Sequence, residues 1–235
     1  MIRTVRRLTA LIVLVSFAVW PQAPDGEKAV PVEAEPDHHL VLQNRYTRVF
    51  KVEVPPHAST LLHRHDRDYV FVVLGPAEVE NAVAGKPPVS LRLADGEVRY
   101  TTGGFAHRAI NKSSAPFRNV TIEILKQGRA VTGGKPERGL DIGHGHMQDV
   151  VMDNSQVRVT EVQIAPGAQS DVHTHKLPHL VIALTDLELL NLPKGRAPAT
   201  MHEKTGDVVW VPAGGTHSLQ NQGSQPARFI AVEFK

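Results

Sequence analysis

One stretch near the end of the chain decides the fold: Gly206-Asp-Val-Val-Trp-Val-Pro212-Ala-Gly214-Gly-Thr-His217-Ser-Leu-Gln-Asn221. Gly206, Gly214, His217 and Asn221 occur in the same order 110 positions earlier, as Gly96, Gly104, His107 and Asn111. A repeat at a fixed offset without insertion indicates two copies of one folded unit. The chain has 235 residues, enough for two units of about a hundred residues each, which is close to the usual size of a domain.

A pair of histidines in each copy shares this offset. His63 and His65 recur as His173 and His175. Because the two members are two positions apart on an expected strand, both side chains point to one face. Short apolar runs cut by proline and glycine surround them, which favours an all-β sandwich or barrel in each copy. Neutral imidazoles that converge inside a barrel cost much desolvation energy if unpaired, so we interpret them as metal ligands.

These stretches resemble the two motifs of the cupin superfamily, G-x5-H-x-H-x3-E-x6-G and G-x5-P-x-G-x2-H-x3-N. The second motif is matched at every defined position from Gly206 to Asn221, and the earlier copy departs from it only at Thr102, which replaces the proline. The first motif is matched at both His-x-His pairs. The resemblance implies a double-stranded β-helix, or jelly roll, in each copy. The expected fold is therefore all-β, with two tandem cupin domains.

The glutamate of the first cupin motif is absent from both copies. Its place is taken by His179 in the second copy and by Tyr69 in the first. The resemblance implies a four-histidine site in the second copy (His173, His175, His179 and His217) and a three-histidine site in the first (His63, His65 and His107). Tyr69 is the predicted catalytic residue, a donor or acid beside the metal. A first copy that has lost its metal site is the alternative.

The implied cofactor is a divalent transition metal, and Mn, Fe, Cu, Ni and Zn all remain open. The resemblance to histidine-only cupins favours a metal-dependent, dioxygenase-like oxidoreductase that acts on a small oxygenated metabolite. The alternatives are a metal-dependent isomerase or lyase, and a cupin that binds a small molecule or metal without catalysis. No free carboxylate stands at motif spacing in the second copy to serve as a general base, which favours binding.

The charge balance and the residue composition limit the kinds of molecule that the protein can bind. The formal net charge is +2, from 26 Lys and Arg against 24 Asp and Glu, but Arg3, Arg6 and Arg7 lie in the N-terminal segment. Without them the balance is 23 against 24, and no basic cluster remains, which argues against nucleic-acid binding. The absence of cysteine excludes disulfides and thiolate ligands. We expect a small-molecule ligand or substrate and a monomeric bicupin or a homodimer.

The expected organisation places a signal peptide at residues 1–23, because three arginines precede a short apolar run from Leu8 to Trp20. Export to the periplasm or beyond follows, with no stable membrane span after processing; an uncleaved anchor is the alternative. A Pro- and Glu-rich tether then covers 24–39, the first cupin domain 40–126, a glycine-rich linker 127–148 and the second domain 149–235. The histidines outside the motifs are interpreted as solvated or incidental: His38, His39, His144, His146 and His202.

Overall fold

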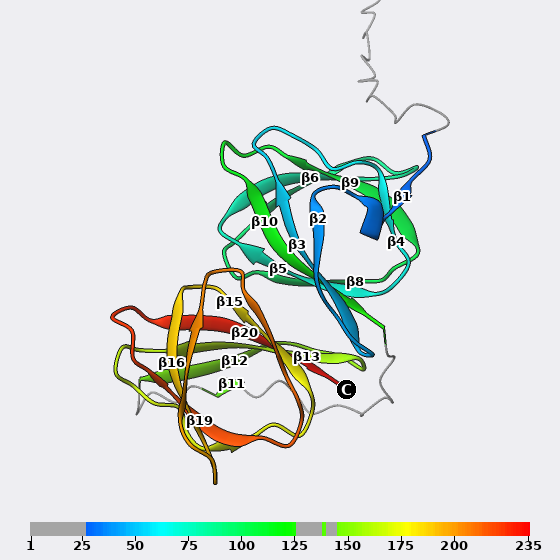
Figure 1. Ribbon diagram of the computed structural model, residues 1–235. Helices are drawn as coiled ribbons and strands as arrows, with labels where there is room; N and C mark the ends of the chain where they lie inside the picture. Colours follow the sequence, from blue (N-terminus) through cyan, green and yellow to red (C-terminus); the bar gives the residue numbers. More distant parts are fainter. Residues whose placement is uncertain (1–26, 126–137, 140–144) are drawn as a thin grey trace, which may run out of the picture.

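The computed structural model describes residues 27–125, 138–139 and 145–235, which form two β-sandwich domains in succession (Figure 1). The all-β, two-domain prediction is confirmed. The signal peptide predicted at 1–23 and most of the linker predicted at 127–148 lie outside the described residues. Within those residues, no helix has the length and apolar character needed to cross a membrane.

Domain 1 is a sandwich of two five-stranded sheets. The first sheet has the order β1 (Val30–Pro31), β4 (His63–His65), β9 (Phe105–Asn111), β6 (Ala77–Val83) and β7 (Val89–Leu93). The second has the order β2 (His38–Gln43), β3 (Thr47–Val54), β10 (Phe117–Ile124), β5 (Tyr69–Leu74) and β8 (Val98–Thr101). A short 3-10 helix, η1 (Val32–Ala34), connects β1 to the second sheet.

Domain 2 repeats this arrangement. One sheet has the order β14 (His173–Thr174), β19 (Thr216–Asn221), β16 (Leu187–Pro193) and β17 (Ala199–Glu203). The other has the order β11 (Arg138–Gly139), β12 (His146–Asp153), β13 (Val157–Ile164), β20 (Ala227–Phe234), β15 (His179–Ala183) and β18 (Val208–Val211). Strands β3, β6, β7, β8 and β10 match β13, β16, β17, β18 and β20 residue for residue at the 110-position offset. Even the register shifts in β2 and β12 fall at equivalent positions.

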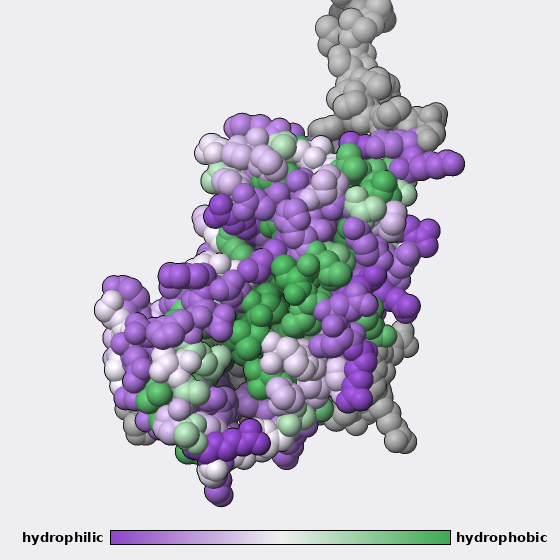
Figure 2. All heavy atoms as spheres, viewed as in Figure 1, coloured by the Kyte–Doolittle hydropathy of each residue, from purple (hydrophilic) through white to green (hydrophobic). Residues whose placement is uncertain are grey.

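The two domains share one hydrophobic core. Alternate side chains of β5, such as Val70 and Val72, pack in the same cluster as Leu180 and Ile182 of β15. The other face of β5 turns inward, where Val73 belongs to the separate core of domain 1. Strands buried on both faces read as continuous apolar runs, which explains the unbroken sequence of β5. Figure 2 shows apolar surface gathered at the middle of the molecule, where the domains meet.

Part of the predicted tether is folded, which corrects that prediction for residues 30–39. Strand β1 pairs in parallel with β4, Val30 lying opposite His63, and Val32 is 1% exposed in the core of domain 1. A two-residue edge strand and a single helical turn need no apolar periodicity, so composition did not reveal them. His146, assigned to the linker, is likewise a buried residue at the start of β12.

Candidate metal sites

Three histidines of domain 2 bring their ring nitrogens together. Strands β14 and β19 pair with His173 opposite His217, and His175 follows β14. The Nε2 atoms of His173 and His175 are 3.1 Å apart, and those of His175 and His217 are 3.2 Å apart. Two nitrogens bound at about 2.1 Å to one ion lie roughly 3.0–3.4 Å apart for octahedral to tetrahedral angles. The spacing therefore fits a shared metal ion.

The hydrogen bonds behind this cluster direct lone pairs inward. The Nδ1 atom of His173 lies 2.9 Å from the carbonyl oxygen of Asp171, which only accepts, so Nδ1 donates and Nε2 keeps its lone pair. The Nδ1 atom of His217 contacts Oδ1 of Asn191 at 2.7 Å in the same way. Burial lowers the pKa of His217 to about 4, so the ring is neutral at pH 7. A cation shared by the three Nε2 atoms would satisfy these lone pairs.

His179 lies beside this cluster rather than in it. Its ring stacks on that of His175, with centroids 4.0 Å apart and planes 27° from parallel. It is absent from the set of three histidines whose nitrogens lie within 4.8 Å of one another. Burial lowers the pKa of His179 to about 4, and its Nδ1 has no hydrogen-bond partner. The structure places the ring of His179 against that of His175, and its role as fourth ligand stays a prediction.

Domain 1 repeats the pattern in a more buried form. His63 and His107 lie opposite each other on β4 and β9, with ring centroids 4.5 Å apart. The Nδ1 of His63 is 2.9 Å from the carbonyl oxygen of Leu61, and that of His107 is 2.7 Å from Oδ1 of Asn81. Both Nε2 atoms are buried without a hydrogen-bond partner. Burial, with neighbouring histidines, lowers the pKa of His63 to about 4 and that of His107 to about 2.

A buried imidazole nitrogen without a hydrogen-bond partner is costly, because it has lost its hydrogen bond with water. Binding to a metal ion offsets this cost. His65 adds a third ring, 5.1 Å from that of His63 and 1% exposed. Burial lowers its pKa as well. The donor set in both domains is therefore imidazole nitrogen, which suits the first-row transition metals.

Tyr69 takes the same position in domain 1 as His179 takes in domain 2. Its ring stacks on that of His65, with centroids 4.2 Å apart and planes 24° from parallel. It is 5% exposed, and burial raises the pKa of its hydroxyl to about 12. The hydroxyl is therefore protonated at neutral pH and available as a donor. Its predicted catalytic role stays a prediction.

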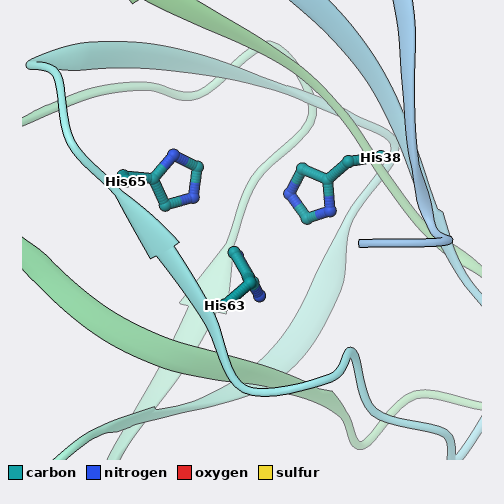
Figure 3. Close-up of side chains that lie close together, drawn as sticks. All are labelled: His38, His63 and His65. Carbon is teal, nitrogen blue, oxygen red and sulfur yellow. The ribbon is translucent and has the colours of Figure 1, made fainter. Parts of the chain in front are cut away.

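A residue that the sequence analysis set aside belongs to the domain 1 cluster. His38, interpreted as solvated, is 8% exposed, and nitrogens of His38, His63 and His65 lie within 4.8 Å of one another. The three rings surround a common space in Figure 3. His107 is not one of the three residues that meet this spacing, although its ring adjoins that of His63. His38 was missed because it lies outside the repeat: the register places Gln148 at the equivalent position of domain 2.

A carboxylate stands behind each cluster, and both were missed although they share the 110-position offset. Glu123 lies 3.8 Å from Nδ1 of His65, and Glu233 lies 3.9 Å from Nδ1 of His175. Glu123 is completely buried and binds Arg48, whose Nη2 is 2.6 Å from the carboxylate. Arg48 thus neutralises a buried charge next to the histidines.

Domain 1 also contains a cavity of about 250 Å³ that opens onto its histidines. Most of the wall is apolar, and the polar groups are few. The apolar lining comprises Val52, Phe71, Val79, Val89, Leu91, Leu93, Ala109 and Phe117, and the polar lining includes Tyr69, Asn81, Arg99, Thr101, Asn119 and Thr121. In domain 2, by contrast, His173, His175 and His217 are each partly exposed.

Known proteins resemble the chain in sequence or fold. The beta-alanine degradation protein BauB of Pseudomonas aeruginosa is 34% identical over 87 residues, which is 37% of this chain and 90% of that protein. AerE from Microcystis aeruginosa superposes with a TM-score of 0.60 at 12% identity, over 86% of this chain and 98% of AerE. No protein-family model matches the chain.

Two further structures share the two-domain architecture. Bacillus subtilis oxalate decarboxylase, which has Mn(II) centres, superposes with a TM-score of 0.58 at 13% identity, over 84% of this chain and 75% of the enzyme. The 7S globulin of Momordica charantia gives 0.61 at 13% identity, over 79% and 72%. Identities this low establish the fold alone. With the BauB relative and the motifs matched in both domains, the chain belongs to the cupin superfamily, as a bicupin with histidine-only metal motifs.

Proposed function

We propose that this protein is a metal-dependent, dioxygenase-like enzyme that acts on a small oxygenated metabolite bound in domain 1. The observation that carries the proposal is the cavity of about 250 Å³ that ends on buried, unpartnered imidazole nitrogens. Largely apolar pockets with a few convergent polar groups are the usual sites of small-molecule chemistry. Typical pockets for drug-sized ligands measure roughly 300–1,000 Å³, so the occupant here is smaller.

The lining suggests the shape of the substrate. Apolar side chains such as Val79 and Leu91 cover most of the wall, whereas Arg99 and Thr101 add polar groups. A substrate with an apolar body and an oxygen-bearing end directed at the histidines matches this division. An ion held by neutral histidines keeps its full charge, and supplies Lewis acidity and, if redox-active, oxygen chemistry. The dry wall strengthens electrostatic interactions with the oxygen-bearing end.

Tyr69 favours a second candidate, a metal-dependent isomerase or lyase. Its hydroxyl is held protonated by burial, with a pKa of about 12, and its ring lies against His65. Such a group donates a hydrogen bond to a substrate oxygen in which negative charge develops. It is a poor base at neutral pH, so its part in either reaction is donation rather than proton abstraction.

Oxygen uptake distinguishes these candidates. The full chain is loaded anaerobically with Fe(II), Mn(II) or Cu(II) and tested with small β-dicarbonyl compounds, which chelate a metal as enolates. The proposal predicts oxygen consumption that matches substrate loss, that disappears in His63→Ala and that survives in the matched surface variant His202→Ala. Turnover without oxygen would replace it with the isomerase or lyase candidate. Binding without turnover would instead indicate a small-molecule carrier.

Export is a separate part of the proposal. The arginines and the apolar run before residue 24 support a cleaved signal peptide. N-terminal sequencing of the mature protein from fractionated cells tests it, and a cytoplasmic protein that retains Met1 would contradict it.

A further inference from the structure

The N-terminal segment of domain 1 reaches the histidine cluster. Strand β1 lies alongside β4 in parallel pairing, and η1 then turns the chain so that β2 begins with His38. The ring centroid of His38 is 4.6 Å from that of His63 and 5.9 Å from that of His65. This segment therefore supplies a fourth imidazole to a cluster whose other members come from the cupin motifs.

The ring of His38 is held by a buried carboxylate. Its Nδ1 lies 2.5 Å from Oε2 of Glu35, whose side chain is inaccessible to solvent. A carboxylate only accepts when ionised, so Nδ1 of His38 donates this hydrogen bond and Nε2 is the nitrogen left for a ligand. Metal-binding histidines usually donate their other ring N–H to such a carboxylate or carbonyl, which fixes the tautomer and raises the basicity of the ligand.

Glu35 also connects His38 to His63. Its Oε1 accepts a hydrogen bond of 3.0 Å from the backbone N–H of Leu61, and its Oε2 accepts one of 2.9 Å from the N–H of Asp37. The carbonyl of the same Leu61 accepts from Nδ1 of His63 at 2.9 Å. Glu35 thus orients His38 directly, and it orients His63 through the backbone of Leu61. Neither ring needs its Nε2 for a protein hydrogen bond.

The remaining nitrogens indicate what the cluster holds. Nε2 of His63 and Nε2 of His107 are buried without a hydrogen-bond partner, whereas Nδ1 of His65 faces Glu123 at 3.8 Å. His63 and His65 are at most 1% exposed. Four imidazoles around one space, of which His38, His63 and His65 are buried, match the donor set of a transition metal.

Domain 2 has Gly145 and Gln148 where Glu35 and His38 stand. Its own buried histidine in this segment is His146, whose ring nitrogens have no hydrogen-bond partner. Burial lowers the pKa of His173, and the charge of His146 lowers it further.

We infer that His38 is a metal ligand of domain 1, that Glu35 orients it, and that the first cupin site is a four-histidine centre completed from outside the cupin motifs. The inference rests on the proposed metal site of domain 1 and names a ligand for it that the repeat does not contain. Tyr69 then remains free of the metal, available to a substrate.

Copper serves as the probe, in a full chain whose domain 2 site is removed by His173→Ala and His217→Ala. Pulsed EPR counts the imidazoles on the bound Cu(II), and a competition titration measures its affinity. Four imidazoles are expected in this background and three after His38→Ala, with affinity lowered about 10- to 100-fold. Glu35→Gln should keep four imidazoles and lower the affinity by a similar factor.

Two further variants control the result. His39→Ala changes the exposed neighbour of His38 and should alter neither number. His38→Gln, which copies Gln148 of domain 2, keeps a donor for Glu35 and should still reduce the count to three, so loss of folding by His38→Ala leaves the test intact. If the number of imidazoles on the bound Cu(II) is the same with and without either His38 substitution, this inference is wrong but the proposed metal site of domain 1 stands. A domain 1 that binds no Cu(II) would overturn the proposed metal site as well.

Discussion

The two domains share one strand plan but surround their histidines differently. In domain 1, β1 covers the outer edge of β4, and His63 is inaccessible to solvent. In domain 2, β14 is itself the edge of its sheet within the described residues, and His173 is partly exposed. In domain 1 this cover comes from residues that precede β2. The ligand-bearing strands are thus alike in the two domains, while His63 is buried and its counterpart His173 is partly exposed.

The largest expected difference concerns the carboxylates behind the clusters. Glu123→Gln should destabilise the chain by about 3 kcal/mol, because it breaks a buried ion pair with Arg48, although Glu33 still contacts that arginine. Glu233→Gln should cost at most about 1 kcal/mol, since Glu233 is partly exposed. Urea unfolding of the metal-free variants measures both, and equal costs would show that the two sites are buried alike.

Acid should weaken the metal-free protein through the same histidines. The folded pKa of His63 is about 4, below its ordinary value of 6.5. A depressed folded pKa contributes stability that is complete above pH 6.5 and is lost as pH falls towards 4, at up to about 1.4 kcal/mol per pH unit for each such group. Stability measured from pH 7 to pH 4 should therefore fall, and His63→Gln should flatten the slope. An unchanged slope in that variant would mean that His63 is not buried as a neutral ring.

A smaller effect, equal in both domains, is expected from the asparagines that hold the third histidine. Asn81 and Asn191 each accept from Nδ1 of their histidine at 2.7 Å. Replacing either with alanine should lower the metal affinity of its own domain by about 10- to 100-fold and leave the other domain unchanged. Competition titrations of the two single variants check this. If only one of the two variants lowers the metal affinity of its domain, the same hydrogen bond does not have the same effect in both domains.

The smallest effect is expected at the position where the domains differ most in sequence. His179→Tyr copies Tyr69 into domain 2 and should keep the metal of that domain, with affinity changed less than about threefold, because His179 stacks on His175 as Tyr69 stacks on His65. Tyr69→Phe is the matched change in domain 1 and should keep its metal too. If His179→Tyr empties domain 2, the predicted four-histidine site of domain 2 is the correct one.

Much of this arrangement could be predicted because duplication marks it. The offset that pairs His63 with His173 identified the jelly rolls and three histidines of each domain from the sequence alone. It also contained Glu123 with Glu233 and Asn81 with Asn191, which were overlooked because a carboxylate or an amide at the end of an apolar run has no distinctive spacing of its own.

Residues outside the repeat could not be predicted in this way. His38 and Glu35 have no counterparts, and their segment reads as a Pro- and Glu-rich tether by composition. They reach the site only through the parallel pairing of β1 with β4, a long-range contact that local sequence does not encode. The sequence also did not reveal that Tyr69 stacks on His65 and that His179 stacks on His175. In each domain this side chain lies against the second histidine of the His-x-His pair.

Metal content per chain tests the central claim, that each domain holds its own metal site, most directly. The protein isolated from its native compartment is analysed for metals together with His63→Ala and His173→Ala. We predict two ions per chain in the wild type and one in each variant, with domain 1 retained in His173→Ala. No bound metal in the wild type would contradict the account, and loss of metal with His173→Ala alone would show that domain 1 is not a metal site.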